Sequence, residues 1–155
     1  MNVSKNFTVT ELTKSADALR KGLDNLPDQD VVDNLKLLAE HVLQPIRDHF
    51  NKPVTINSGY RSKAVNASVG GSATSDHCKG MAADIEIVGI DNLVLAQHIV
   101  DTYKFTQIIL EFYTAGMPDS GWVHVSYNKD RLNSQVLTAV KKDGKTVYLP
   151  GLITK

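Results

Sequence analysis

Hydrophobic residues recur every three to four positions between residues 30 and 50, which is the spacing of one face of an amphipathic helix. The stripe is formed by Val31, Leu35, Leu38, Val42, Ile46 and Phe50. Pro45 lies inside this segment and is expected to kink the helix or to leave one backbone carbonyl free. A short helix capped by Thr8 is predicted at residues 8–12, and weaker helical character extends over residues 19–26.

Later in the chain the pattern changes to short segments of alternating or continuous hydrophobic residues, which predict strands. The predicted strands are residues 53–57, 83–88, 106–112, 122–127, 136–140 and 146–149. Asp143-Gly144 is a strong signal for a tight hairpin turn between the last two strands. Residues 92–103 predict a helix, and residues 64–74, rich in Ser, Gly and Ala, predict a loop beside the site. The expected fold is α+β, with a small, largely antiparallel sheet packed on helices.

Composition narrows the possible classes of protein. The 155 residues, 42% of them hydrophobic, fit a single domain spanning residues 1–155, and we expect a monomer. The net charge is zero, so nothing indicates a nucleic-acid partner or an anionic membrane. Cys78 has no second cysteine to pair with, and we expect it to be a packed or half-exposed side chain rather than a metal ligand. No segment is apolar enough for a signal peptide or a membrane span, so synthesis in the cytoplasm is expected.

Three predicted strands place their polar residues on the face opposite the core, because successive residues of a strand point to opposite sides. These polar residues are Asp84 and Glu86, Gln107 and Glu111, and Trp122, His124 and Ser126. His77 reaches the same face from the preceding loop, and Gly80 lets the backbone turn sharply before Asp84. Two imidazoles and one carboxylate leave the fourth position of a tetrahedral zinc site open, as in catalytic zinc centres. The sequence therefore predicts that His77, Asp84 and His124 bind Zn²⁺, whereas His41 and His49 are expected at the surface.

The motif Ser75-x-His77-x-x-Gly80-x-Ala82-x-Asp84, preceded by Ser58-Gly59-Tyr60-Arg61-Ser62 and followed by Trp122-x-His124, resembles a known family of zinc peptidases. These are the D-alanyl-D-alanine carboxypeptidases and L-alanyl-D-glutamate endopeptidases, which share their fold with the hedgehog signalling domain. The resemblance covers roughly residues 7–127 and is nearest to the short single-domain forms encoded by phages and prophages. It implies a zinc enzyme that hydrolyses a peptide bond in the stem peptide or cross-link of bacterial peptidoglycan.

The resemblance also implies roles for individual residues. A general base must take a proton from water and pass it to the leaving amine, and strand parity favours Glu111 for this role. The family commonly has an acidic residue three positions before its last zinc histidine, but Gly121 stands there in this chain, so Asp119 and Glu86 remain alternatives. Arg61 is expected to bind a substrate carboxylate or the developing oxyanion, with a structural salt bridge as the alternative.

Three further residues are assigned to substrate binding. Ser75 and Gln107 are expected to orient ligands or substrate, and Trp122 is expected to form a wall of the cleft or, alternatively, to pack in the core.

Two functions are compatible with these residues. The first is a phage or prophage endolysin that stays in the cytoplasm until a membrane lesion releases it to the cell wall. The alternative is a zinc-stabilised, non-catalytic module that binds the cell wall or forms part of a virion. The bond that an enzyme would cut depends on the loops at residues 65–74 and 113–120.

Overall fold

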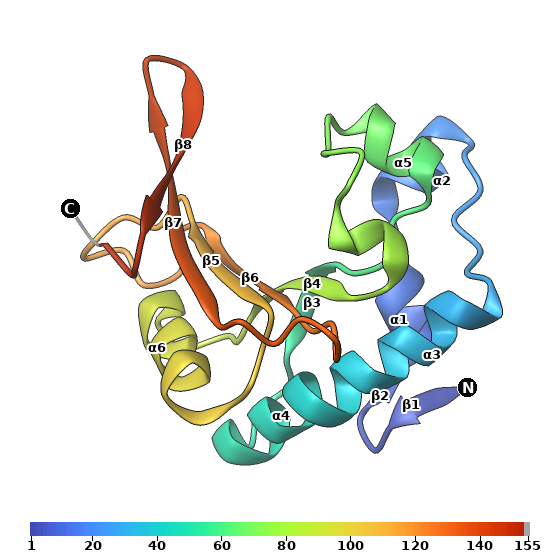
Figure 1. The fold of residues 1–155 in the computed structure, drawn as a ribbon, viewed down its shortest axis with the longest axis horizontal. Helices are drawn as coiled ribbons and strands as arrows, with labels where there is room; N and C mark the ends of the chain where they lie inside the picture. The colour runs from blue at the N-terminus through green and yellow to red at the C-terminus, as the bar shows by residue number, and fades with distance from the viewer. Residues whose placement is uncertain (154–155) are drawn as a thin grey trace.

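The computed structural model describes residues 1–153, in which helices cover one face of a sheet (Figure 1). The helices are α1 (Val9–Thr13), α2 (Ala16–Lys21), α3 (Gln29–Leu38), η1 (Ala39–Leu43), α4 (Gln44–Phe50), α5 (Lys63–Ser68), η2 (Asp76–Lys79) and α6 (Asn92–Thr102). The strands are β1 (Asn2–Ser4), β2 (Phe7–Thr8), β3 (Thr55–Ser58), β4 (Ala82–Glu86), β5 (Gln107–Glu111), β6 (Trp122–Ser126), β7 (Gln135–Lys142) and β8 (Lys145–Pro150). This arrangement confirms the predicted α+β class.

The amphipathic segment predicted at residues 30–50 is helical throughout, but not as a regular α-helix. Its middle part, η1, is a π-helical turn that lies directly before Pro45. The N–H of Gln44 bonds there to the carbonyl of Ala39, five residues back. A π-turn accommodates a proline that has no N–H to donate, so the irregularity expected at Pro45 takes this form.

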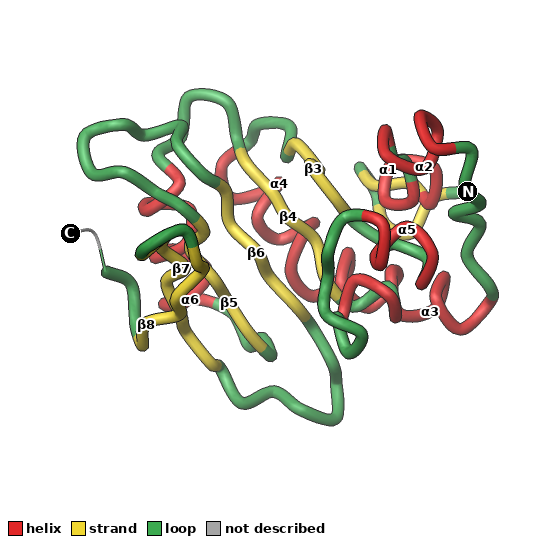
Figure 2. The backbone as a smooth tube through the Cα atoms, turned by 90° about the horizontal axis from the view of Figure 1, so that it is seen from above, coloured by secondary structure: helices red, strands yellow, loops and turns green. Residues whose placement is uncertain are grey.

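The six-stranded sheet has the order β3-β4-β6-β5-β7-β8, and its neighbouring strands are antiparallel except for the parallel pair β5 and β7. One face packs on the helix of residues 29–50 and on α6, which Figure 2 shows behind the strands. The core residues of this face include Ile85, Ile108, Leu110, Val123 and Val125, all fully buried. The other face is left open to carry polar side chains, as strand alternation predicted.

The strand register places residues of the open face in rows across the sheet. One row contains Asp84, His124, Ile109 and Leu137. The neighbouring row contains Trp122, Glu111, Ala139 and Tyr148. Because paired residues of adjacent strands point to the same side, each row brings together side chains that lie far apart in the sequence.

Two sequence predictions in the N-terminal half were wrong. Residues 64–74 were expected to form a loop, but α5 occupies Lys63–Ser68, with the Ser62 hydroxyl accepting from the Val65 N–H as its N-cap. A helix this short has no hydrophobic periodicity to reveal it. Helical structure was also expected at residues 19–26, whereas α2 ends at Lys21, because the next residue, Gly22, has a left-handed φ of 66° that stops the helix.

The remaining helix predictions agree with the structure. Thr8 caps α1 by accepting a hydrogen bond from the Glu11 N–H at 3.1 Å.

None of the helices described over residues 1–153 has the length and apolar character needed to cross a membrane.

Candidate metal centre and cleft

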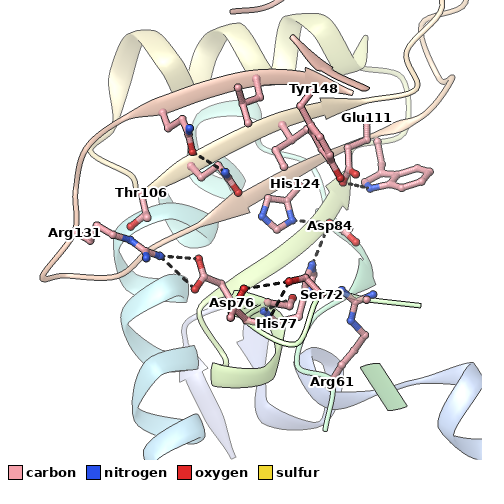
Figure 3. A pocket seen from close by; sticks show the side chains of 18 of the residues that line it. Arg61, Ser72, Asp76, His77, Asp84, Thr106, Glu111, His124, Arg131 and Tyr148 are labelled. Carbon is pink, nitrogen blue, oxygen red and sulfur yellow. Dashed lines mark hydrogen bonds and ion pairs between the residues drawn. The ribbon is translucent and has the colours of Figure 1, made fainter. Parts of the chain in front are cut away.

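His77, Asp84 and His124 converge on one point although they come from three elements, η2, β4 and β6. His77 Nε2 lies 3.4 Å and His124 Nδ1 lies 3.1 Å from Asp84 Oδ1. One donor atom from each residue lies within 4.8 Å of the other two. Both imidazoles are buried, with exposed fractions of 2% for His77 and 8% for His124. The structure therefore brings together the three residues that the motifs singled out (Figure 3).

Backbone contacts orient His77 toward this point. Its Nδ1 lies 2.7 Å from the carbonyl oxygen of Gly59, and its backbone N–H bonds to the Ser75 hydroxyl at 3.2 Å. A carbonyl oxygen can only accept, so Nδ1 carries a proton, and Nε2 is the ring nitrogen that is turned toward Asp84. A Cβ at position 59 would collide with the backbone of Leu12, so only glycine fits where this carbonyl is held.

Gly80 shapes the turn between the first two clustered residues, as predicted. Its φ is 72°, and a Cβ at this position would lie 2.7 Å from the carbonyl oxygen of Val31 and 3.2 Å from Leu35. Glycine is therefore required both by the backbone conformation and by the space available.

The electrostatics of the cluster favour a charged carboxylate. Burial alone would raise the pKa of Asp84, but the hydrogen bonds and charges of His124 and His77 outweigh it and hold the pKa well below its ordinary value. Burial would lower the pKa of His124, but the hydrogen bond to Asp84 and the charges of nearby carboxylates outweigh it and raise the pKa.

These donors fit a zinc ion. Zinc binds imidazole nitrogens and carboxylate oxygens, and three protein ligands leave a fourth position open for water or substrate. The Nδ1–H bond from His77 to Gly59 is the kind of outer contact that fixes the orientation of a metal-binding imidazole.

The cluster lies in a cleft of about 630 Å³. One wall is formed by Arg61 and by the segment of residues 70–77, and the floor contains Asp84, His124 and Glu111. The opposite wall is formed by residues that follow β6, namely Arg131, Asn133, Gln135, Leu137 and Tyr148. In Figure 1 the hairpin of β7 and β8 and the helix α5 accordingly stand on either side of the sheet's open face.

Glu111 is a carboxylate of the cleft whose surroundings resemble those of a general base. Its Oε2 accepts a hydrogen bond from the Trp122 indole N–H at 2.8 Å. Burial, and next the charge of Asp84, raises the pKa of Glu111, although His124, the Trp122 hydrogen bond and Arg61 act in the opposite direction. A buried carboxyl group with a raised pKa is typical of residues that transfer protons.

The conformation of Gly121 explains why no acidic side chain stands at that position. Its φ is 63°, and a Cβ there would collide with the backbone of Glu111 and Phe112. Gly121 packs against the backbone of Glu111, which lines the cleft from the neighbouring strand β5.

The two other carboxylates considered as bases are not among the residues that line the cleft. Glu86 accepts hydrogen bonds from the side-chain amides of Asn57 at 2.7 Å and Asn92 at 3.2 Å. Asp119 is exposed in the connection between β5 and β6.

Arg61, Ser75, Gln107 and Trp122 all line the cleft. The Nε of Arg61 is buried and has no hydrogen-bond partner within residues 1–153, so one donor of its guanidinium is left unsatisfied. No ion pair involves Arg61 among these residues, which does not favour the structural salt bridge considered for it. The Gln107 side-chain amide nitrogen donates to the side-chain Oε1 of Gln135 at 2.7 Å.

Sequence reasoning missed the residues of the far wall. Arg131 forms an ion pair with Asp76 at 3.2 Å and so links this wall to η2, which carries His77. Tyr148 alternates with Val147 and Leu149, and this alternation could have placed it on the polar face of its strand. No sequence signal, however, indicated that this strand lies beside the cleft.

The chain matches the Peptidase M15 family over residues 5–126. It is also similar to the zinc D-Ala-D-Ala carboxypeptidase of Streptomyces albus G, with 39% identity over 59 residues. This segment is 38% of the present chain and 23% of that relative, so most of the relative has no counterpart in the match. The match to the family contains the three clustered residues, Arg61 and Glu111, and it ends before β7.

Proposed function

This chain belongs to the peptidase M15 family, and we propose that it is a zinc peptidase that hydrolyses a peptide bond in the stem peptide or cross-link of bacterial peptidoglycan. The relative named above is a zinc D-Ala-D-Ala carboxypeptidase, which supports both the metal and this substrate class. This proposal rests on the convergence of His77, Asp84 and His124 in a cleft that Glu111 and Arg61 also line.

In this proposal each residue has a distinct task. His77, Asp84 and His124 hold zinc, which supplies a Lewis acid that polarises the scissile carbonyl and acidifies water. Glu111 accepts a proton from the attacking water and donates it to the leaving amine, so it ends the reaction as a carboxylate. Arg61 binds a carboxylate of the peptide by charge-assisted hydrogen bonds, and thereby positions the substrate.

The other cleft residues support these tasks. The Trp122 indole holds the Glu111 carboxylate in place, and Ser75 helps to fix the backbone at His77. Gln107 offers an amide to the peptide from the floor of the cleft.

The direct test uses purified, zinc-loaded protein and isolated peptidoglycan, with release of free amines as the readout. We expect amine release with zinc and none after chelation, and mass spectrometry of the products identifies the bond as D-Ala-D-Ala, L-Ala-D-Glu or a cross-bridge. A zinc-loaded, folded protein that releases no amines from peptidoglycan would favour the non-catalytic wall-binding module instead.

We further propose that the 155 residues act as a monomeric, single-domain endolysin of a phage or prophage. The resemblance of its motifs to the short phage forms supports this role. Expression inside a bacterium should then cause lysis only after the membrane is permeabilised. Equal survival of cells that express the wild type and the His77→Ala variant after permeabilisation would contradict a lytic role.

A further inference from the structure

The hairpin of β7 and β8 forms a cleft wall that the family match does not include, because that match ends at residue 126. Leu137 and Tyr148 belong to this wall. Leu137 continues the row that contains Asp84, His124 and Ile109, so only strand β5 separates the hairpin from His124.

Ala139 creates the space that Tyr148 uses. It pairs with Glu111 on one side and with Tyr148 on the other, so it stands between the two side chains in one row of the open face. Ala139 carries only a methyl group and is 0% exposed, so neighbouring side chains cover it. The Tyr148 side chain extends from β8 toward Glu111 in Figure 3. Because Ala139 is short, the Tyr148 ring on β8 can approach Glu111 on β5, two strands away.

The Tyr148 hydroxyl forms no hydrogen bond within residues 1–153, unlike the hydroxyls of Tyr103 and Tyr113, which bond to His98 and Asp91. The hydroxyls of Tyr60 and Tyr127 also lack such a bond, but of the five tyrosines only Tyr148 lines the cleft. The side chain is 53% exposed, although it borders the cleft. Aromatic side chains with a free polar end, placed at the mouth of a cleft, are typical of ligand-binding sites.

We propose that Tyr148 is a substrate-binding residue, a role that rests on the proposed peptidase function. Its hydroxyl donates a hydrogen bond to a backbone carbonyl oxygen of the peptide bound over Glu111, and its ring closes that end of the cleft. The hairpin, rather than the metal-binding motif alone, then determines which peptides are accepted.

The chemistry of both partners fits this contact. A peptide chain presents carbonyl oxygens that accept hydrogen bonds, and a phenol is a good donor while it keeps its proton. Burial, and next the charge of Glu111, raises the pKa of Tyr148, so the hydroxyl stays protonated at neutral pH. Because Tyr148 is not one of the three clustered residues, its removal should leave metal binding unchanged.

The test compares the wild type with Tyr148→Phe, which keeps the ring and removes only the hydroxyl. The substrate is the synthetic pentapeptide L-Ala-γ-D-Glu-L-Lys-D-Ala-D-Ala, which contains two of the three candidate bonds, L-Ala-D-Glu and D-Ala-D-Ala. We expect kcat/KM to fall roughly 10-fold, mainly through KM, as for the loss of one hydrogen bond to substrate. Tyr148→Ala should lower it further. The matched control is Tyr113→Phe, which removes a hydroxyl that bonds to Asp91 outside the cleft and should retain wild-type kinetics.

Zinc content and thermal midpoint are measured for every variant, so that misfolding cannot imitate the effect. Wild-type kcat/KM in a folded Tyr148→Phe variant would overturn the role of Tyr148 while leaving the proposed function intact. If the wild type binds the pentapeptide without cleaving it, the dissociation constants of the same variants decide, and an unchanged value in Tyr148→Phe again overturns the role. If the wild type neither binds nor cleaves the pentapeptide or peptidoglycan, the proposed function fails and the role of Tyr148 fails with it.

Discussion

The groups around Glu111 shift its pKa in opposite directions. Burial and Asp84 favour the protonated form, whereas His124, the Trp122 indole and Arg61 favour the carboxylate. The net effect raises the pKa of Glu111. A carboxyl group tuned in this way can accept a proton from water and release it within the same reaction cycle, which the proposed hydrolysis requires.

Glu111→Gln should lower the rate of peptide hydrolysis by about 100-fold to 10,000-fold, because an amide cannot accept the proton. Zinc content and thermal midpoint should stay close to those of the wild type, since Gln has nearly the same shape. The assay is amine release from peptidoglycan, with Asp119→Asn as the matched control in an exposed loop. A wild-type rate in Glu111→Gln, or an equal loss in Asp119→Asn, would exclude Glu111 as the base.

Trp122→Phe should move the acidic limb of the pH–rate profile to higher pH. The indole N–H stabilises the charged form of Glu111, so removing this donor raises the pKa of the carboxyl group further. A base works only when deprotonated, and activity is therefore lost at a higher pH as the solution is acidified. The measurement is kcat/KM against pH at constant zinc content. A limb that stays in place or moves to lower pH would contradict this account of Glu111.

At the scale of single elements, local geometry was predictable and pairing between distant strands was not. Alternation along β4, β5 and β6 predicted which side chains share a face, because a strand alternates whatever its neighbours are. The long stripe of residues 30–50 predicted a helix for the same local reason. The π-helical form of η1 depends on how the chain adjusts around Pro45, which the stripe does not encode.

The parallel pairing of β5 with β7 had no sequence signal, and it places Leu137 and Tyr148 in the cleft. Parity alone put Asp84, Glu86, Trp122 and Glu111 on one face, but only the register distinguishes the residues that line the cleft from Glu86. The candidate ligands were accessible from sequence because two compact motifs carry them. The far wall was not, because it depends on contacts between distant parts of the chain.

Gly121→Ala should destabilise the fold more than Gly22→Ala. Both glycines have positive φ, at 63° and 66°, and an alanine at either position should cost about 1–2 kcal/mol for the left-handed backbone. Only Gly121 also lacks space, because a Cβ there meets the backbone of Glu111 and Phe112. Free energies of unfolding from denaturant titrations give the difference between the variants. Equal losses would show that the collision is relieved without cost.

At the scale of the whole molecule, a single ion would connect elements that are distant in sequence. η2, β4 and β6 each contribute one of the three clustered residues, and the unfolded chain cannot hold them together. A ligand that binds only the folded state stabilises that state in proportion to the logarithm of its concentration over its dissociation constant. Removing zinc should therefore lower the stability of the folded state as well as the activity.

Chelation of zinc should lower the thermal midpoint. At a free zinc concentration of about 1,000 times the dissociation constant, binding contributes about 4 kcal/mol, which corresponds to a shift of roughly 10 °C for a chain of this size. The response should disappear in His77→Ala and persist in His49→Ala, since His49 is exposed on α4, outside the cluster. The affinity should also fall as the pH is lowered, because protons compete for the imidazoles and the pKa of His124 is raised. If chelation leaves the thermal midpoint of the wild type unchanged, the cluster does not bind zinc.

The hairpin of β7 and β8 also covers a strand edge that would otherwise be exposed. A chain that ended after β6 would retain all three clustered residues, but the outer backbone groups of β5 would be left without partners. Such an unpaired edge is a template for aggregation with other chains. β7 covers it, and the new edge strand β8 begins at Lys145 and ends at Pro150, a charge and an imino acid that both discourage edge-to-edge association.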